Sequence, residues 1–377
     1  MATFLNSIDV GAKGQRTLPA IAFTSAELFA AEQRHLFGTR WLCVGREADI
    51  AVPGAYVLRE IGPESLIIVR DQRGTIHAHF NVCRHRGTRL CEAARGTFGQ
   101  TIQCPYHAWT YGLDGRLIGV PDIKELDDFC KDDHPLHEAE CTTWEGFIFV
   151  NLSEDAEPFV SAFAPLIDKW SAWNLPALRS QGRVTYEVRA NWKLVVQNYS
   201  ECYHCSPVHP ALVKLSPPTS GGNDLTDGPF LGGYMDVPEP GGSLTLSGRA
   251  CGLPVGDLDP ADLQRVYYYT LFPNVLLSLH HDYVMVHTLW PRGPGHTTIE
   301  CEWLFHPDTS ATAGLDPQDG IAFWDRTNRE DWHVSELTQL GVASSRYTPG
   351  PYSAREAMSA AFDREYIRAM SGSGFDL

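Results

Sequence analysis

The chain has 377 residues, of which 43% are hydrophobic and 20% are charged, and its formal net charge is −16. This composition excludes a disordered or fibrous protein, and the acidic balance argues against nucleic acid or an anionic membrane surface as the main partner. No apolar run approaches the roughly 18–20 residues of a membrane span, and the first residues lack the parts of a secretory signal, so we expect a cytoplasmic protein.

The first 150 residues divide into a helical segment and a β domain. Residues 24–40 are predicted to form a helix, because Thr24 or Ser25 is a suitable N-cap and Glu27 places a carboxylate in the first turn. From 41 to 152, short runs rich in Val, Ile, Phe and Tyr alternate with Gly, Pro and Asp turns. This pattern is typical of a small antiparallel β domain. We assign residues 1–40 to an N-terminal helical segment that packs on the later domain.

The second part, residues 153–377, mixes strands and helices. An amphipathic stretch near 157–173 links the two parts, and a strand at 183–190 leads into a helix predicted over 191–205. Several β-rich runs follow between 265 and 306, and two helices are predicted near 316–339 and 353–370. The expected fold class is therefore α+β, with an antiparallel sheet and helices packed on one face.

Four side chains that can bind metal lie at short spacing within the β domain. Cys83 and His85 form a C-x-H pair, and after eighteen residues Cys104 and His107 form a C-x2-H pair. Two thiolates and two imidazoles suit a tetrahedral zinc ion, or a [2Fe–2S] cluster in which two His replace two Cys on one iron. The spacing favours the cluster, because zinc fingers use C-x2-C and H-x3-5-H instead. A zinc-stabilised binding module stays as an alternative.

The remaining cysteines are interpreted differently. In a chain of this length without a secretory signal, we expect cysteines to stay reduced, and those outside a motif to act as small buried hydrophobic residues. This interpretation applies to five residues, Cys43, Cys130, Cys141, Cys251 and Cys301.

A second group of potential ligands follows the predicted strand at 183–190. Glu201 and His204 are three residues apart and would share a face of the predicted helix, and Pro207 is expected to end that helix so that His209 turns back towards His204. Two neutral imidazoles and one carboxylate form the facial triad of non-haem Fe(II) oxygenases. Taken alone, the pair can also be interpreted as one histidine in the core and one on the surface, with no role in metal binding.

Both groups resemble one protein family. The segment 40–150, with Arg84, Arg86, Gly87, Pro105 and Trp109 around the four ligands, resembles a Rieske domain. The pattern Asn198-x2-Glu201-x2-His204-x4-His209 resembles the iron-binding stretch of Rieske oxygenase catalytic domains. The resemblance implies an antiparallel β Rieske domain over 41–152 and a helix-grip-like catalytic domain over 153–377.

The resemblance also implies which residues hold the cofactors. Cys83, His85, Cys104 and His107 would bind the Rieske [2Fe–2S] cluster, and His204, His209 and a carboxylate of a later helix would bind a mononuclear Fe(II). Asp331 is the expected third ligand, with Asp325 and Glu330 as alternatives because the register of that helix is open. Glu201 would be the bridging carboxylate, with Asn198 in the same catalytic motif. In the homotrimers typical of the family, this carboxylate contacts a Rieske His of the neighbouring subunit.

The function implied is that of a terminal oxygenase, which uses O2 and electrons that a separate ferredoxin-type flavoprotein reductase takes from NAD(P)H. Glutamate at position 201 and the segment 344–352 resemble the branch that acts on carnitine, glycine betaine and stachydrine. We therefore predict hydroxylation and loss of an N-methyl group of a quaternary amine, within an aromatic cage for which Tyr203, Tyr283 and Trp290 are possible walls. Aromatic ring hydroxylation and an electron-transfer protein without mononuclear iron are the alternatives.

Overall fold

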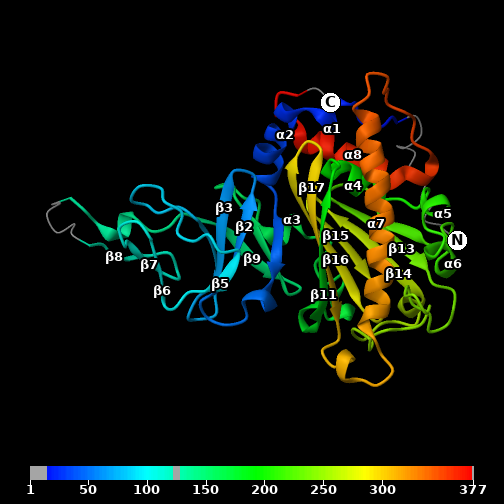
Figure 1. Ribbon diagram of the computed structural model, residues 1–377, viewed down its shortest axis with the longest axis horizontal. Coiled ribbons are helices and arrows are strands. Elements are labelled where there is room, and N and C mark those ends of the chain that lie inside the picture. The colour runs from blue at the N-terminus through cyan, green and yellow to red at the C-terminus, as the bar shows by residue number, and fades with distance from the viewer. Residues whose placement is uncertain (1–14, 122–127, 376–377) are drawn as a thin grey trace. The chain divides into compact units, whose positions relative to one another are not determined.

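The computed structural model describes residues 15–121 and 128–375, and the chain divides into two compact units (Figure 1). One unit spans residues 37–162, and the other combines the residues up to 36 with residues 163–377. The second unit is therefore discontinuous in the sequence, with the first unit inserted between its two parts. Among the described residues, no helix combines the length and the apolar character that a membrane span requires.

The unit of residues 37–162 is built from antiparallel strands, as the sequence predicts. Its seven-stranded sheet has the order β1-β10-β9-β4-β3-β2-β5, and a three-stranded sheet has the order β6-β7-β8. The larger sheet consists of β1 (Leu42–Arg46), β2 (Ala55–Ile61), β3 (Glu64–Arg70), β4 (Ile76–Phe80), β5 (Arg95–Thr97), β9 (Glu138–Trp144) and β10 (Phe147–Asn151). The smaller sheet consists of β6 (Thr101–Gln103), β7 (Thr110–Gly112) and β8 (Leu117–Gly119), and the short helix α3 (Phe159–Ala162) ends the unit.

The other unit is an antiparallel sheet covered by helices, which confirms the α+β fold class. Its strand order is β11-β17-β16-β15-β14-β13-β12. The strands are β11 (Arg179–Val188), β12 (Gly222–Leu225), β13 (Phe230–Asp236), β14 (Arg265–Leu271), β15 (Val275–Leu279), β16 (Val284–Gly293) and β17 (His296–Phe305). The helices are α1 (Ile21–Thr24), α2 (Ala26–Glu32), α4 (Trp192–Tyr199), α5 (Cys205–Val208), α6 (Leu212–Leu215), α7 (Pro317–Val342) and α8 (Ala357–Met370).

Helix α7 lies along the sheet (Figure 1) and packs on β11 and α4. Asp316 caps its first turn by accepting a hydrogen bond from the Gln318 amide, and Pro317 occupies the first position, where a missing N–H costs nothing. The helix approaches the sheet closely at Gly182, where an added Cβ would lie 2.8 Å from the Ile321 side chain. A side chain at position 182 would therefore crowd Ile321 of α7.

A buried ion pair joins the N-terminal segment to α4. The Lys193 ammonium lies 2.5 Å from the Glu32 carboxylate, and the two side chains are 0% and 1% exposed. Glu32 also accepts hydrogen bonds from the Trp192 indole at 3.0 Å and from the Tyr366 hydroxyl at 2.6 Å. The carboxylate therefore connects α2, α4 and α8.

The helix predicted over 191–205 was wrong in its second half. Asn191 caps α4 as a helix start should, but the helix ends at Tyr199. The Glu201 carboxylate then accepts hydrogen bonds from the amides of Tyr203 and His204, and such a local side-chain contact competes with helix continuation. Pro207 does not end a helix either, since it lies within α5. The stretch 157–173, predicted to link the two parts, contains α3 and a 3-10 turn at Ser171–Trp173.

Candidate metal centres

Two tight turns in the β unit present the four residues of the first motif. Cys83 and His85 lie between β4 and β5, and Cys104 and His107 lie between β6 and β7. Each turn is closed by a backbone hydrogen bond to the cysteine carbonyl, at 3.0 Å from the Gly87 amide and at 3.1 Å from the Ala108 amide. The two turns therefore have the same construction, with the cysteine first and the histidine two or three residues later.

The four side chains make contact in two pairs, cysteine with cysteine and histidine with histidine. Both cysteines are 3% exposed, while the rings of His85 and His107 lie 4.7 Å apart and His85 is exposed. Burial and the neighbouring Cys83 raise the pKa of Cys104, so two thiolates at this place need bound cations. The buried Nδ1 atom of His107 has no hydrogen-bond partner. Two neighbouring thiols, two neighbouring imidazoles and an unpartnered ring nitrogen fit the [2Fe–2S] centre with mixed ligation.

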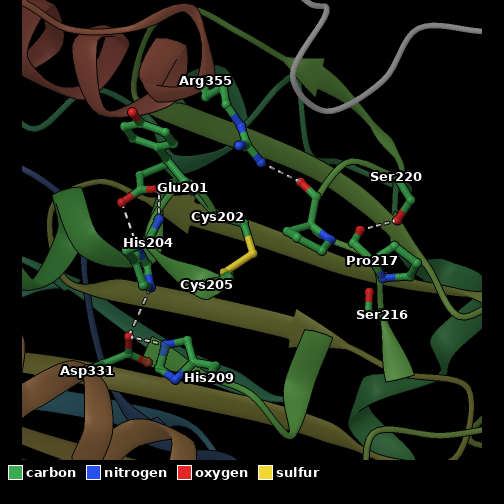
Figure 2. Close-up of a disulfide and its surroundings, with 12 residues drawn as sticks. Glu201, Cys202, His204, Cys205, His209, Ser216, Pro217, Ser220, Asp331 and Arg355 are labelled. Carbon is green, nitrogen blue, oxygen red and sulfur yellow. Dashed lines mark hydrogen bonds and ion pairs between the residues drawn. A yellow bond between two sulfur atoms is a disulfide. The ribbon is translucent and has the colours of Figure 1, made fainter. Parts of the chain in front are cut away.

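The second centre forms where the loop after α4 meets the middle of α7 (Figure 2). Asp331 Oδ1 lies 3.2 Å from His204 Nε2 and 2.8 Å from His209 Nε2, and the donor atoms of the three residues lie within 4.8 Å of one another. The other ring nitrogen of each histidine is held by a second carboxylate, at 2.7 Å from Glu201 and at 2.9 Å from Glu330. Such outer carboxylates fix the orientation of metal-binding imidazoles.

The electrostatics of this group favour a bound cation. Burial lowers the pKa of His204, but its hydrogen bonds to Asp331 and Glu201 outweigh burial and raise the pKa to about 10. Burial alone would raise the pKa of Asp331, yet the two histidines lower it to about 2. Protons on the imidazoles thus compensate carboxylates that a divalent ion would otherwise neutralise. Two imidazoles and one carboxylate with a cavity beside them fit a mononuclear Fe(II) with open coordination positions.

The structure separates the three carboxylates considered as the last ligand. Only Asp331 approaches both histidines, because it lies on the face of α7 that also carries Trp324 and Asn328, seven and three residues before it. Glu330, one residue earlier, contacts the outer nitrogen of His209 instead. Asp325 is bound by Arg329 and by the Tyr186 hydroxyl and does not take part.

A solvent-connected cavity of about 60 Å³ lies next to Asp331. Its walls combine the aromatic and thioether side chains of Tyr199, Met235, Tyr268, Met285, Trp324 and Trp332 with polar groups such as Asn198, His287 and Asn328. The three aromatic residues considered from the sequence are not among these walls. Tyr283 and Trp290 are buried in the core, and Tyr203 is 50% exposed. The prediction of these walls failed because side chains alternate between the two faces of a strand. A β-rich run does not reveal which of its aromatic residues face the helices.

Two cysteines beside the second centre were missed. Cys202 and Cys205 form a disulfide with Cα atoms 4.9 Å apart, so the expectation that the cysteines stay reduced was wrong for this pair. The C-x2-C spacing was the signal that could have identified them. The interpretation of Cys130 as a packing residue was also wrong, because its side chain is exposed.

Comparisons with known proteins agree with both centres. Residues 40–130 match the family of the Rieske [2Fe-2S] domain, and residues 175–372 match the ring hydroxylating alpha subunit (catalytic domain). The chain is 33% identical to a glycine betaine monooxygenase oxygenase subunit of Chromohalobacter salexigens, over 90% of this chain and 82% of the relative. It is 35% identical to a carnitine monooxygenase oxygenase subunit of Escherichia coli (strain K12), over 52% of each chain.

A solved structure of a quaternary ammonium Rieske monooxygenase shares the fold, with a TM-score of 0.81 at 24% identity, covering 95% of each chain. The two family matches confirm the expectation of a Rieske domain followed by a Rieske oxygenase catalytic domain.

Proposed function

Since the chain belongs to the Rieske-type ring-hydroxylating oxygenases and is an oxygenase component, we propose that it hydroxylates an N-methyl group of a small quaternary amine, with release of formaldehyde. The observation that carries this proposal is the aromatic lining of the cavity. Tyr268, Trp324 and Trp332 line the same space as Asp331, and aromatic faces attract a quaternary ammonium group. The names of the relatives that act on glycine betaine and carnitine point to the same substrate class.

The cofactor ligands follow from the two centres. We assign the Rieske cluster to Cys83, His85, Cys104 and His107, and the mononuclear iron to His204, His209 and Asp331. When bound, the cluster supplies single electrons and the mononuclear iron activates O2. The protein's own groups orient the ligand imidazoles and exclude water. Glu201 and Glu330 hold the outer nitrogens of the two ligand imidazoles, and the apolar walls keep bulk water away from the substrate methyl group.

Electron delivery requires further chains in this proposal. The relatives are named as oxygenase subunits, which supports a separate reductase that takes electrons from NAD(P)H, and this dependence favours a cytoplasmic location. We further assign a homotrimer in which the exposed His85 of one subunit approaches Glu201 of the next. In that arrangement Glu201 accepts a hydrogen bond from His204 Nδ1 within its own chain and links it to the neighbouring cluster.

The test is formaldehyde release from choline, glycine betaine, carnitine and stachydrine by the iron-loaded protein with a surrogate reductase, NADH and O2. We expect release with one of them and its loss in a Glu201→Gln variant that keeps its cluster spectrum. Release from none, by protein with a reducible cluster and full iron content, would refute the quaternary amine. Hydroxylation of an aromatic ring in the same assay would establish the alternative substrate class.

A matched pair of variants tests the cavity wall. Tyr268→Leu removes a lining ring, whereas Tyr267→Leu removes the next ring of β14, which does not line the cavity. A cation–π contact is worth about 0.5–2 kcal/mol, so the KM of the first variant should rise roughly 2- to 30-fold and that of the second should stay unchanged. A neutral isostere of the substrate, with carbon in place of nitrogen, should bind more weakly to the wild type. Equal binding of both would contradict recognition of the charge.

A further inference from the structure

The disulfide Cys202–Cys205 encloses a residue of the second centre. The bridge spans Cys202-Tyr203-His204-Cys205, so His204 lies within the ring that the two sulfur atoms close (Figure 2). Glu201, which holds His204 Nδ1, directly precedes the ring. The disulfide therefore constrains the backbone that carries one of the three convergent donors.

The same bridge also reaches His209. Cys205 is the first residue of α5, and its carbonyl accepts a hydrogen bond of 2.8 Å from the His209 amide. The Cys205 amide in turn donates to the Cys202 carbonyl at 3.3 Å. Both histidines are thus fixed, directly or through one turn of α5, to the two bridged cysteines.

The two cysteines are accessible from the cavity although they are buried from the outer surface. They are 5% and 4% exposed, yet both line the solvent-connected cavity in which O2 and substrate would meet. Within the part of the chain that the structure describes, the other eight cysteines form no disulfide. A small oxidant that enters this cavity therefore meets a pair of sulfur atoms already placed to join.

We propose that Cys202 and Cys205 form a reversible redox-modification site that controls iron binding at His204, His209 and Asp331. Hydrogen peroxide is the oxidant. One thiol is oxidised to a sulfenic acid as the O–O bond breaks and water leaves, and the second thiol displaces a second water to form the S–S bond. Two thiols and one peroxide thus give one disulfide and two waters. An external dithiol reverses the reaction by exchange and becomes a disulfide itself.

The oxidised form is the better iron-binding form. Its bridge holds His204 in the orientation that faces Asp331, so binding of the ion costs less conformational entropy. Reduction opens the ring, lets Tyr203 and His204 move, and loosens the start of α5. The pair thereby keeps the centre assembled under peroxide exposure and makes its iron exchangeable under reducing conditions. This inference rests on the proposed role of His204 as an iron ligand.

The experiment has two readouts on the full iron-loaded chain. In the first, wild-type protein is treated with peroxide, and its free thiols are alkylated before and after reduction with a phosphine. Mass spectrometry of the peptide that contains Cys202 and Cys205 should show two labels only after reduction. Two labels on this peptide without the reductant would overturn the proposal, and this readout does not depend on iron.

In the second readout, loss of mononuclear iron to a ferrous chelator is followed in the oxidised and the phosphine-reduced protein. We expect several-fold faster loss after reduction, and equally fast loss from Cys202→Ser/Cys205→Ser under both conditions. A Cys251→Ser variant, which changes a lone buried thiol, should behave like the wild type. An unchanged cluster spectrum and unfolding temperature verify that the double variant is folded. Equal rates in both redox states would refute the coupling, whereas absence of mononuclear iron from all samples would refute the proposed function instead.

Discussion

Replacement of Lys193 by methionine tests the buried ion pair on which α4 rests. The change removes the cation but leaves the Glu32 carboxylate buried, with the Trp192 indole and the Tyr366 hydroxyl as its remaining donors. Removal of one partner of a buried pair costs about 3–5 kcal/mol. We expect the lower end, about 3 kcal/mol, because two hydrogen bonds to the carboxylate persist.

In a folding unit of this size, 1 kcal/mol shifts the unfolding temperature by roughly 2–4 °C, so the expected decrease is about 6–12 °C. Scanning calorimetry measures it, with the visible absorption of the cluster reporting separately on the other unit. The double variant Lys193→Met/Glu32→Gln should recover part of the loss, because the amide oxygen still accepts from Trp192 and Tyr366 while no unpaired buried charge remains. A shift below about 2 °C in the single variant, or a double variant less stable than the single one, would refute the reasoning.

Three further predictions concern the two centres. Asp331→Asn should lose the mononuclear iron and keep the cluster, so that metal analysis finds about two irons per chain instead of about three, and retention of the third iron would contradict the assigned ligand. Tyr111→Phe removes the hydroxyl 3.3 Å from Cys83 Sγ and should lower the cluster potential by an amount on the order of tens of millivolts in voltammetry; an unchanged potential would argue against that hydrogen bond. In metal-free protein, the folded pKa of His204, about 10, lies above the ordinary value of 6.5, so its contribution to stability is complete below about pH 6.5 and is lost as the pH rises towards 10. Urea midpoints of metal-free protein should therefore fall between about pH 6.5 and pH 9.5, and equal midpoints would contradict the shift.

The sequence was most informative where the chemistry is local. The C-x-H and C-x2-H motifs place each cysteine and its histidine on one turn, so their spacing alone identifies the four candidate ligands. The apolar runs and turn residues around them identify the β domain. Helix α7 was also predictable, because Asp316 and Pro317 mark its start and its apolar residues recur at helical spacing. The position of Asp331 then followed from the resemblance to family members, and in the structure its carboxylate lies beside both histidines.

The rest depended on contacts that spacing does not encode. The end of α4 at Tyr199 results from the Glu201 carboxylate, which satisfies nearby backbone amides as well as His204. The cavity walls were unpredictable for another reason. Tyr267 and Tyr268 are adjacent in one β run, and only the register of the sheet decides which ring faces α7.

The insertion of one unit within the other has a consequence for the order of events on the ribosome. Residues 37–162 form a complete unit that includes all four cysteines and histidines of the first motif, and they emerge before any strand of the second sheet. At about 5–20 residues per second, the remaining 215 residues (377 minus 162) take roughly 10–40 s to synthesise. For most of that interval Glu32 is without Tyr366 and the second centre is without Asp331, because these residues belong to α8 and α7. The unit that carries the first motif is thus finished first, and the second centre is complete only once α7 has been translated.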